Sequence, residues 1–287
     1  MIGTIIQNIS NSYKVVDEKG NVLICTARGK LKQEEQIPVV GDKVKIENGA
    51  ISKIEKRKNY IKRPKIANID QIIFVLAVKD PKPDILLLDK QLAFAENLGV
   101  KSIIVLNKCD LANGDEIKEL YEKVGYTVLK MQAKNKIGME ELKSFLKDKI
   151  TVFSGNSGVG KSTIINSLLK NSVTEEGEIS NKNKKGKNTT TAVTLYELEK
   201  NTYIADTPGF STFDITEIEY NNLDKEFIEF IPFISECKYV GCSHIYEDIK
   251  ECNVKMALSE GKISLSRYNN YKKIYEELKD KYKRRYN

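Results

Sequence analysis

Apolar and polar residues alternate in short runs along the first 60 residues, and a turn signal separates most of the runs. The runs cover 3–9, 12–16, 22–27, 42–47 and 50–56. Alternation with a period of two is typical of half-buried strands, and the polar stretches at 17–21 and 48–49 supply turns. Five short strands in a segment of this length predict a small β-barrel of the OB or SH3-like kind.

From residue 66 the pattern changes to apolar runs that alternate with helical periodicity. Strands are expected at 71–77, 101–106, 126–131, 151–153, 191–197 and 202–205, with helices at 84–97, 113–124 and 139–146 and a further helix after residue 163. Helices between nearly continuous apolar strands indicate crossover connections and hence a mostly parallel, doubly wound sheet. Such a sheet binds its ligand beyond the carboxyl ends of its strands.

The last part of the chain combines short helical segments with a long basic helix, expected at 265–285. Tyrosines in this helix are spaced by three, four and seven residues: Tyr268, Tyr271, Tyr275 and Tyr282. This spacing puts their rings on one helix face, which favours packing against the rest of the module. The predicted fold class is therefore α/β, with an OB-fold barrel at 1–65, a nucleotide-binding domain at 66–225 and a C-terminal helical module at 226–287.

Residues 155–162 match the phosphate-binding pattern G-x-x-x-x-G-K-[ST], between an expected strand and an expected helix. Glycines let the backbone curl so that successive N–H groups face phosphate oxygens, and the helix N-terminus adds its positive end. Lys161 is expected to reach the β- and γ-phosphates, while the Ser162 hydroxyl binds Mg²⁺. The residues expected to contact the nucleotide here are Gly155, Asn156, Ser157, Gly158, Val159, Gly160, Lys161, Ser162 and Thr163. A glycine-rich turn without a ligand is the alternative, which the strand–loop–helix setting opposes.

Asn107-Lys108-Cys109-Asp110 follows one of the expected strands and, beside a phosphate loop, indicates recognition of guanine. A carboxylate at Asp110 can accept hydrogen bonds from N1–H and N2–H of guanine, whereas adenine offers no such pair of donors. The Lys108 stem can lie over the base, and Asn107 can tie the loop to its surroundings. On its own the motif is weak, because Asp110 could equally cap the next helix.

Two further segments complete a site for GTP. Gln132-Ala133-Lys134 is similar to the Ser-Ala-Lys segment whose backbone N–H groups bind guanine O6 in GTPases, and the departure at Gln132 does not affect backbone donation. Asp206 and Gly209 match D-x-x-G, in which the carboxylate holds Mg²⁺ through water and the glycine N–H contacts the γ-phosphate. Together these motifs favour GTP over ATP as the substrate, with Mg²⁺ as its partner ion.

The order of the motifs is unusual. In a Ras-like GTPase the phosphate loop comes first and Asn-Lys-x-Asp later, whereas here 107–110 precedes 155–162. A site built from strand ends is indifferent to chain order, and permutation is tolerated where termini lie close together at the surface. The order therefore predicts a circularly permuted P-loop GTPase domain, in which the D-x-x-G segment runs directly toward the C-terminal module.

Cys237, Cys242, His244 and Cys252 lie in a loop-rich stretch with the spacing C-x₄-C-x-H-x₇-C. Three thiolates and one imidazole suit a closed tetrahedral shell, which is the structural kind of Zn²⁺ site. His244 is the only histidine of the chain, so its use as a zinc ligand leaves none for catalysis. Buried thiols without a metal are the alternative. Cysteines in this arrangement suit a reducing cytosol better than a disulfide framework.

The net charge of +7 is unevenly spread: residues 1–65 carry +7, residues 267–287 carry +5 and the remainder carries −5. Basic ends favour a polyanionic partner, most simply RNA, and few aromatics in the barrel favour shape and phosphate recognition over base stacking. Solvated surface charge is the alternative. The N-terminus shows no basic and apolar leader, and no apolar run reaches about 18 residues, so neither a signal peptide nor a membrane span is expected.

A basic five-stranded barrel, a permuted GTPase domain and a cysteine–histidine module, over essentially the whole chain, resemble the ribosome small subunit-dependent GTPase A family. The resemblance implies a cytoplasmic GTP hydrolase that binds the small (30S) ribosomal subunit and its rRNA late in maturation, hydrolyses GTP to GDP when the subunit stimulates it, and leaves. We expect a monomer that makes no membrane contact, with one structural Zn²⁺ and with Mg²⁺ bound beside GTP. An rRNA-binding protein with a structural or vestigial nucleotide site is the alternative function.

The resemblance also identifies the threonine-rich stretch 186–191 as a switch, which contributes to catalysis together with Lys161. Thr190 is expected to close over Mg²⁺ and the γ-phosphate, with its neighbours as alternatives, and Asn188 stands where the family usually has histidine. An amide can orient water but cannot act as a general base near neutral pH. Phe210 follows Gly209, where many GTPases place a water-orienting glutamine. These residues predict slow turnover in the absence of the ribosome.

Overall fold

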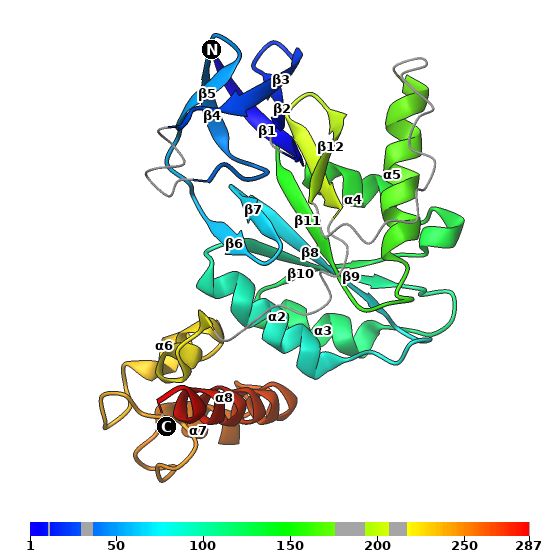
Figure 1. Cartoon of the computed structure of the whole chain (residues 1–287). Helices are drawn as coiled ribbons and strands as arrows, with labels where there is room; N and C mark the ends of the chain where they lie inside the picture. The colour runs from blue at the N-terminus through cyan, green and yellow to red at the C-terminus, as the bar shows by residue number, and fades with distance from the viewer. Residues whose placement is uncertain (11, 30–36, 176–192, 207–216, 287) are drawn as a thin grey trace.

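The computed structural model describes residues 1–10, 12–29, 37–175, 193–206 and 217–286. A small barrel, a central sheet with helices on both faces and a C-terminal helical module follow one another along the chain (Figure 1). Asn188, Thr190 and Gly209 lie outside the described residues, as does Phe210, and the predictions made for them stay predictions.

The barrel is built from the strands that alternation predicts. They are β1 (Ile2–Ile9), β2 (Ser12–Asp17), β3 (Val22–Ala27), β4 (Lys43–Glu47) and β5 (Ala50–Ile54). The strands pair in the order β1-β2-β3-β5-β4, and β4 pairs back onto β1, which closes the barrel. Alternate residues point inward, so Ile5, Val15 and Ile51 are fully buried. The OB-like barrel is thereby confirmed.

A short hairpin that the sequence did not predict connects the barrel to the sheet. It consists of β6 (Tyr60–Lys62) and β7 (Lys65–Ala67). Each strand has three residues, too few for a period of two to be recognised among charged neighbours. The connection is held by Asp42, whose buried carboxylate accepts hydrogen bonds from Arg57 Nε at 2.7 Å and from Val39 N–H at 2.8 Å.

The central sheet has the predicted doubly wound form. Its strands are β8 (Gln71–Ala77), β9 (Lys101–Asn107), β10 (Thr127–Lys130), β11 (Ile150–Ser154), β12 (Thr194–Glu199) and β13 (Thr202–Asp206). They lie in the order β10-β9-β8-β11-β13-β12, and only β12 runs antiparallel to its neighbour β13 among the described strands. Strands β8 to β10 extend the sheet in one direction, and β11 to β13 extend it in the other. The carboxyl ends of β8 and β11 are therefore the topological switch point, where sheets of this kind bind ligands.

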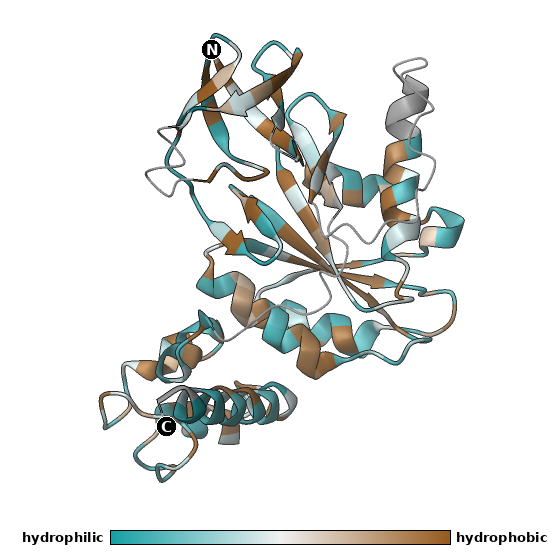
Figure 2. Cartoon of the chain, viewed as in Figure 1, coloured by the Kyte–Doolittle hydropathy of each residue, from teal (hydrophilic) through white to brown (hydrophobic). Residues whose placement is uncertain are grey.

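Helices cover both faces of this sheet (Figure 1). Helices α2 (Ile85–Asn97) and α3 (Asp115–Val124) lie on one face, and α4 (Met139–Leu146) and α5 (Lys161–Glu175) lie on the other. Strand β8 shows why: Ile72 and Phe74 belong to the core under α2, whereas Ile73 and Val75 belong to the core under α4 and α5. The strands are accordingly apolar over most of their length (Figure 2). Helix α2 begins at a side-chain cap, because Asp84 Oδ1 accepts a hydrogen bond from Leu87 N–H.

The barrel and the sheet are joined by strand pairing as well as by the chain. Strand β1 pairs with β12 antiparallel at Gln7 and Thr194, so one hydrogen-bonded sheet of eleven strands runs from β10 through β12 into the barrel. Strand β12 begins two residues after the stretch 176–192, which contains the expected threonine-rich switch. Periodicity predicts the strand but not its long-range partner.

The C-terminal module consists of a 3₁₀ segment and three helices. They are η3 (Tyr220–Glu226), α6 (Ile231–Ile234), α7 (Asn253–Ser259) and α8 (Leu265–Tyr286). The tyrosine face of α8 packs inward as predicted, since Tyr268, Tyr271 and Tyr275 are buried, while Tyr282 remains 46% exposed. No helix of the described chain is long and apolar enough to cross a membrane.

Candidate nucleotide site and metal cluster

The phosphate loop joins β11 to α5 at the carboxyl edge of the sheet. Its backbone requires glycine at two points. A Cβ at Gly155 would lie 2.3 Å from the Val75 carbonyl oxygen, and a Cβ at Gly160 would lie 2.2 Å from Asn107 Nδ2. Gly160 also has a φ of +98°, a conformation that side chains other than glycine rarely adopt. The loop therefore curls tightly against β8 and β9, and α5 begins directly after it.

Asn107 connects the three nucleotide motifs. It ends β9 and is 2% exposed. Its Nδ2 donates to the Val159 carbonyl in the phosphate loop at 2.9 Å, and its Oδ1 accepts from Ala133 N–H at 2.9 Å. One amide thus holds the phosphate loop, the Asn-Lys-x-Asp loop and the 132–134 segment together, which is the tying role expected of it.

These three segments line a common pocket of about 310 Å³. The residues that line it are Asn107, Lys108, Asp110, Leu111, Ala133, Lys134, Gly160 and Thr163. They come from stretches up to 56 positions apart in the chain, and the structure brings them to one edge of the sheet. A carboxylate therefore stands at the same pocket as the phosphate loop, which is the arrangement that a guanine nucleotide requires.

The contacts around the base-recognition loop refine the prediction for the 132–134 segment. Because Ala133 N–H donates to Asn107, the remaining candidate among these backbone donors for guanine O6 at the pocket wall is Lys134 N–H. Gln132 is the N-terminal cap of η1 (Ala133–Asn135), and Cys109 N–H donates to the Met131 carbonyl at 3.1 Å. The base-recognition loop is thus bonded to the residue that follows β10.

Two lysine side chains near the pocket donate to backbone carbonyls. Lys161 Nζ donates to the Gly155 carbonyl at 3.2 Å, so its side chain folds back over the loop. Lys108 Nζ donates to the Asp80 carbonyl, which lies in the 78–84 loop after β8. No motif predicts that contact, because a backbone carbonyl can belong to any residue. Burial raises the pKa of the Cys109 thiol, so the side chain of this motif residue stays neutral.

The expected Mg²⁺ ligands fall on neighbouring elements. Ser162 lies in the first turn of α5 with an exposed side chain, and Asp206 is the last residue of β13, which runs parallel to β11. Parallel neighbours end at the same edge of a sheet, so both residues lie at the edge that carries the phosphate loop. A hydroxyl and a carboxylate are oxygen donors of the type that Mg²⁺ prefers, and the residues present therefore fit the ion.

The four predicted zinc ligands form one cluster. The ligand atoms of Cys237, Cys242, His244 and Cys252 all lie within 4.8 Å of one another, and three of the residues are buried. His244 Nδ1 lies 3.4 Å from Cys252 Sγ and 3.7 Å from Cys237 Sγ. Ligand bonds of a tetrahedral Zn²⁺ site imply about 3.6 Å between sulfur and nitrogen, so the donor set fits this metal in both chemistry and size.

The pKa shifts of His244 and Cys252 agree with a set of metal ligands. Burial lowers the pKa of the imidazole, but hydrogen bonds with Asp224 and Cys252 raise it, to about 9 overall. Burial raises the pKa of the Cys252 thiol while the hydrogen bond from His244 lowers it, and the lowering dominates. The imidazolium form of His244 thus favours the thiolate of Cys252, whereas burial raises the pKa of the Cys242 thiol.

Helix α8 fixes the backbone of the metal loop. The hydroxyl of Tyr268 donates to the His244 carbonyl at 2.6 Å, and that of Tyr271 donates to the Ser243 carbonyl at 2.9 Å. Glu247 accepts from Ser243 N–H at 2.8 Å, which closes the loop on itself. The tyrosines that the sequence predicted as packing residues therefore also position the ligands, a role that their spacing alone does not reveal.

Family and structure comparisons agree with this geometry. Residues 2–53 match the model of the RsgA N-terminal domain and residues 54–216 match that of the RsgA GTPase. Proteins named small ribosomal subunit biogenesis GTPase RsgA from Ruminiclostridium cellulolyticum and Alkaliphilus metalliredigens are each 40% identical to the chain. The alignments cover 97% of this chain and 94% of the first protein, and 96% and 97% for the second.

Solved structures extend the likeness to the fold. The crystal structure of YjeQ from Thermotoga maritima matches with a TM-score of 0.83 and 35% identity, over 96% of this chain and 98% of that one. The structure of YloQ, described as a circularly permuted GTPase, matches with a TM-score of 0.81 and 32% identity, over 98% and 95%.

Proposed function

The chain belongs to the RsgA GTPase family and is a GTP-hydrolysing enzyme with a circularly permuted domain, and from this premise we propose how it acts. It binds the small ribosomal subunit late in assembly, hydrolyses GTP to GDP and phosphate when the subunit stimulates it, and then dissociates. The names of its relatives, small ribosomal subunit biogenesis GTPases, support this partner and this process.

One observation carries the nucleotide part of the proposal. Asp110, Lys134 and Gly160 line a single pocket, although they come from three motifs in permuted order. In our proposal Asp110 accepts both guanine donors, and the Lys108 stem covers the base. The pocket then continues into the phosphate loop, where backbone N–H groups and Lys161 contact the phosphates.

The chemistry at the γ-phosphate follows from the same residues. Phosphoryl transfer needs positioning and charge stabilisation more than covalent catalysis. Lys161 stabilises charge that develops on the phosphate oxygens, and Ser162 and Asp206 would hold Mg²⁺, which neutralises further charge when it is bound. We propose that Thr190 and Gly209 close over the γ-phosphate and that Asn188 orients the attacking water. With Phe210 in place of glutamine, we propose that water positioning is weak until the subunit stimulates turnover.

Basic surface supports the ribosomal partner. In the barrel, Lys43 and Lys45 alternate with buried Val44 and Ile46 along β4, so their side chains face solvent. Phosphate contacts from such lysines are independent of base sequence and fit structured rRNA. We propose that the barrel and the C-terminal module, whose cysteine–histidine cluster would hold one Zn²⁺, both contact the subunit. A partner of this kind implies that the protein acts in the cytoplasm, and we propose that it does so as a monomer.

The proposal is tested by measuring GTP turnover of the full chain alone, with purified small subunits and with purified large subunits, using ATP as the control substrate. We expect slow turnover alone and an acceleration of at least about tenfold by small subunits only, equivalent to about 1.4 kcal/mol of barrier. Fast turnover without ribosomes would contradict the proposed activation. Tight binding to small subunits without any turnover would instead support an rRNA-binding protein with a vestigial site.

A further inference from the structure

We propose that Asp224 is an outer-shell residue of the metal site: His244 binds the metal through Nδ1, and Asp224 accepts a hydrogen bond from Nε2–H. Asp224 lies in η3, outside the stretch that carries the four ligands. Its role is to orient the imidazole and to make it a better ligand, which is how carboxylates act behind metal-bound histidines.

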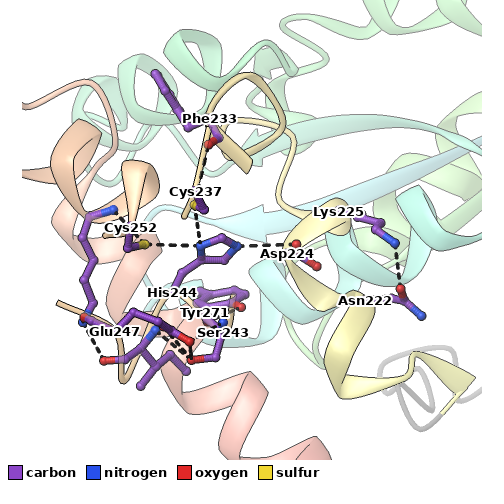
Figure 3. Close-up of polar contacts among 12 residues, drawn as sticks. Asn222, Asp224, Lys225, Phe233, Cys237, Ser243, His244, Glu247, Cys252 and Tyr271 are labelled. Carbon is purple, nitrogen blue, oxygen red and sulfur yellow. Dashed lines mark hydrogen bonds and ion pairs between the residues drawn. The ribbon is translucent and has the colours of Figure 1, made fainter. Parts of the chain in front are cut away.

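The geometry distinguishes the two ring nitrogens. Nδ1 faces the cluster, at 3.4 Å from Cys252 Sγ and 3.7 Å from Cys237 Sγ. Nε2 points the opposite way, toward Asp224 Oδ2 at 3.5 Å, at the long end of the hydrogen-bond range (Figure 3). His244 is fully buried, and the Tyr268 hydroxyl bonds its backbone carbonyl, so both the ring and the backbone of this residue are enclosed by the module.

Burial of Asp224 supports this role independently. The residue is 8% exposed, and its Oδ1 atom has no hydrogen-bond partner within the described part of the chain. His244 is also its ion-pair partner there. A buried carboxylate is costly unless a donor or a cation compensates it. A metal-bound imidazole compensates it, because binding at Nδ1 leaves the proton on Nε2 and increases the acidity of that N–H group.

The arrangement links the metal to the nucleotide domain. Segment η3 follows the stretch 207–216, which leaves β13 after Asp206, and Leu223 of η3 is fully buried in the core that also contains α2. Through Asp224 the metal site is therefore bonded to the segment that leads out of the nucleotide-binding sheet. Loss of metal is expected to loosen η3 as well as the cysteine loop.

The presence of one histidine in the chain permits a direct test. Zinc-loaded protein with ¹⁵N-labelled histidine gives a single set of imidazole signals in long-range ¹H–¹⁵N spectra. We expect a metal-bound Nδ1 and a protonated Nε2 whose proton exchanges slowly with water because Asp224 holds it. In Asp224→Ala the same proton is expected to exchange faster. A metal-bound Nε2, or a proton whose exchange the substitution does not change, would overturn the proposal.

Zinc affinity supplies the second measurement, by competition with a chromophoric chelator. Asp224→Ala is expected to bind zinc about 10- to 100-fold more weakly than the wild type, and Asp224→Asn, which keeps an acceptor oxygen, is expected to lose less. Asp248→Asn is the matched control, since this exposed carboxylate lies in the cysteine loop and, among the described residues, accepts a hydrogen bond only from Lys250 N–H. Equal zinc affinities for Asp224→Ala and the control would refute the role, and a circular dichroism spectrum checks that each variant is folded.

Discussion

Replacing Lys161 with alanine is expected to lower GTP turnover by about 10²- to 10³-fold while the protein stays folded. Lys161 is the first residue of α5, and its side chain folds over the phosphate loop so that the ammonium group donates to the Gly155 carbonyl. It is the side-chain cation that the motif directs at the β- and γ-phosphates, and removal of one preorganised donor to developing charge has an effect of this size. Single-turnover hydrolysis with saturating small subunits measures it.

Lys170→Ala is the matched control for this substitution. Lys170 lies on the same helix more than two turns away, with an exposed side chain. The control should retain wild-type turnover to within about twofold, because a surface substitution away from such features has little effect. If Lys161→Ala hydrolysed GTP as fast as this control, the phosphate loop would not be the catalytic site.

Replacing Arg267 with methionine is expected to destabilise the protein by about 3–5 kcal/mol, since it breaks a buried ion network. Arg267 on α8 is 1% exposed. Its Nη1 donates to Asp89 on α2 at 2.6 Å, and its Nε and Nη2 donate to Glu229 at 2.7 and 2.9 Å. The substitution leaves two carboxylates without their cation, and one of them, Asp89, is fully buried.

The network joins the C-terminal module to the nucleotide domain, so the loss should be largest at that contact. Tyr121 and Asn270 also donate to Asp89, and within the described part of the chain removal of the arginine leaves Asp89 with these neutral partners. Equilibrium urea unfolding measures the effect, with Lys273→Ala on the exposed face of α8 as the control. A shift for Arg267→Met no larger than that of the control would show that the buried charges contribute nothing to the attachment of the module.

Local patterns in the sequence predicted the elements that repeat a simple periodicity. The barrel strands, the alternating sheet and the tyrosine face of α8 all follow from periods of two or 3.6 residues. The phosphate loop and the base-recognition loop are also local, because each motif lies within about ten residues. The cysteine cluster could be predicted because metal ligands require particular residue types rather than particular neighbours.

Contacts that depend on distant parts of the chain were not predicted. Pairing of Gln7 with Thr194 needs two strands 187 positions apart, and no property of either strand specifies the other. The bond of Asn107 to Val159 was expected only in the general sense of a tie to the surroundings. Asp224 had no signal, since a single carboxylate outside the cysteine stretch resembles any surface acid until its burial is known.

The claim that one pocket unites base recognition with phosphate binding is tested most directly by calorimetric titration of the protein with GDP, ADP and xanthosine diphosphate. The wild type is expected to bind GDP at least about 100-fold more tightly than ADP, equivalent to about 2.7 kcal/mol. In Asp110→Asn the preference should pass from GDP to xanthosine diphosphate, because an amide N–H can donate to the carbonyl that replaces the 2-amino group. Binding of ADP within threefold of GDP, or a preference for GDP that survives the Asp110 substitution, would contradict the account.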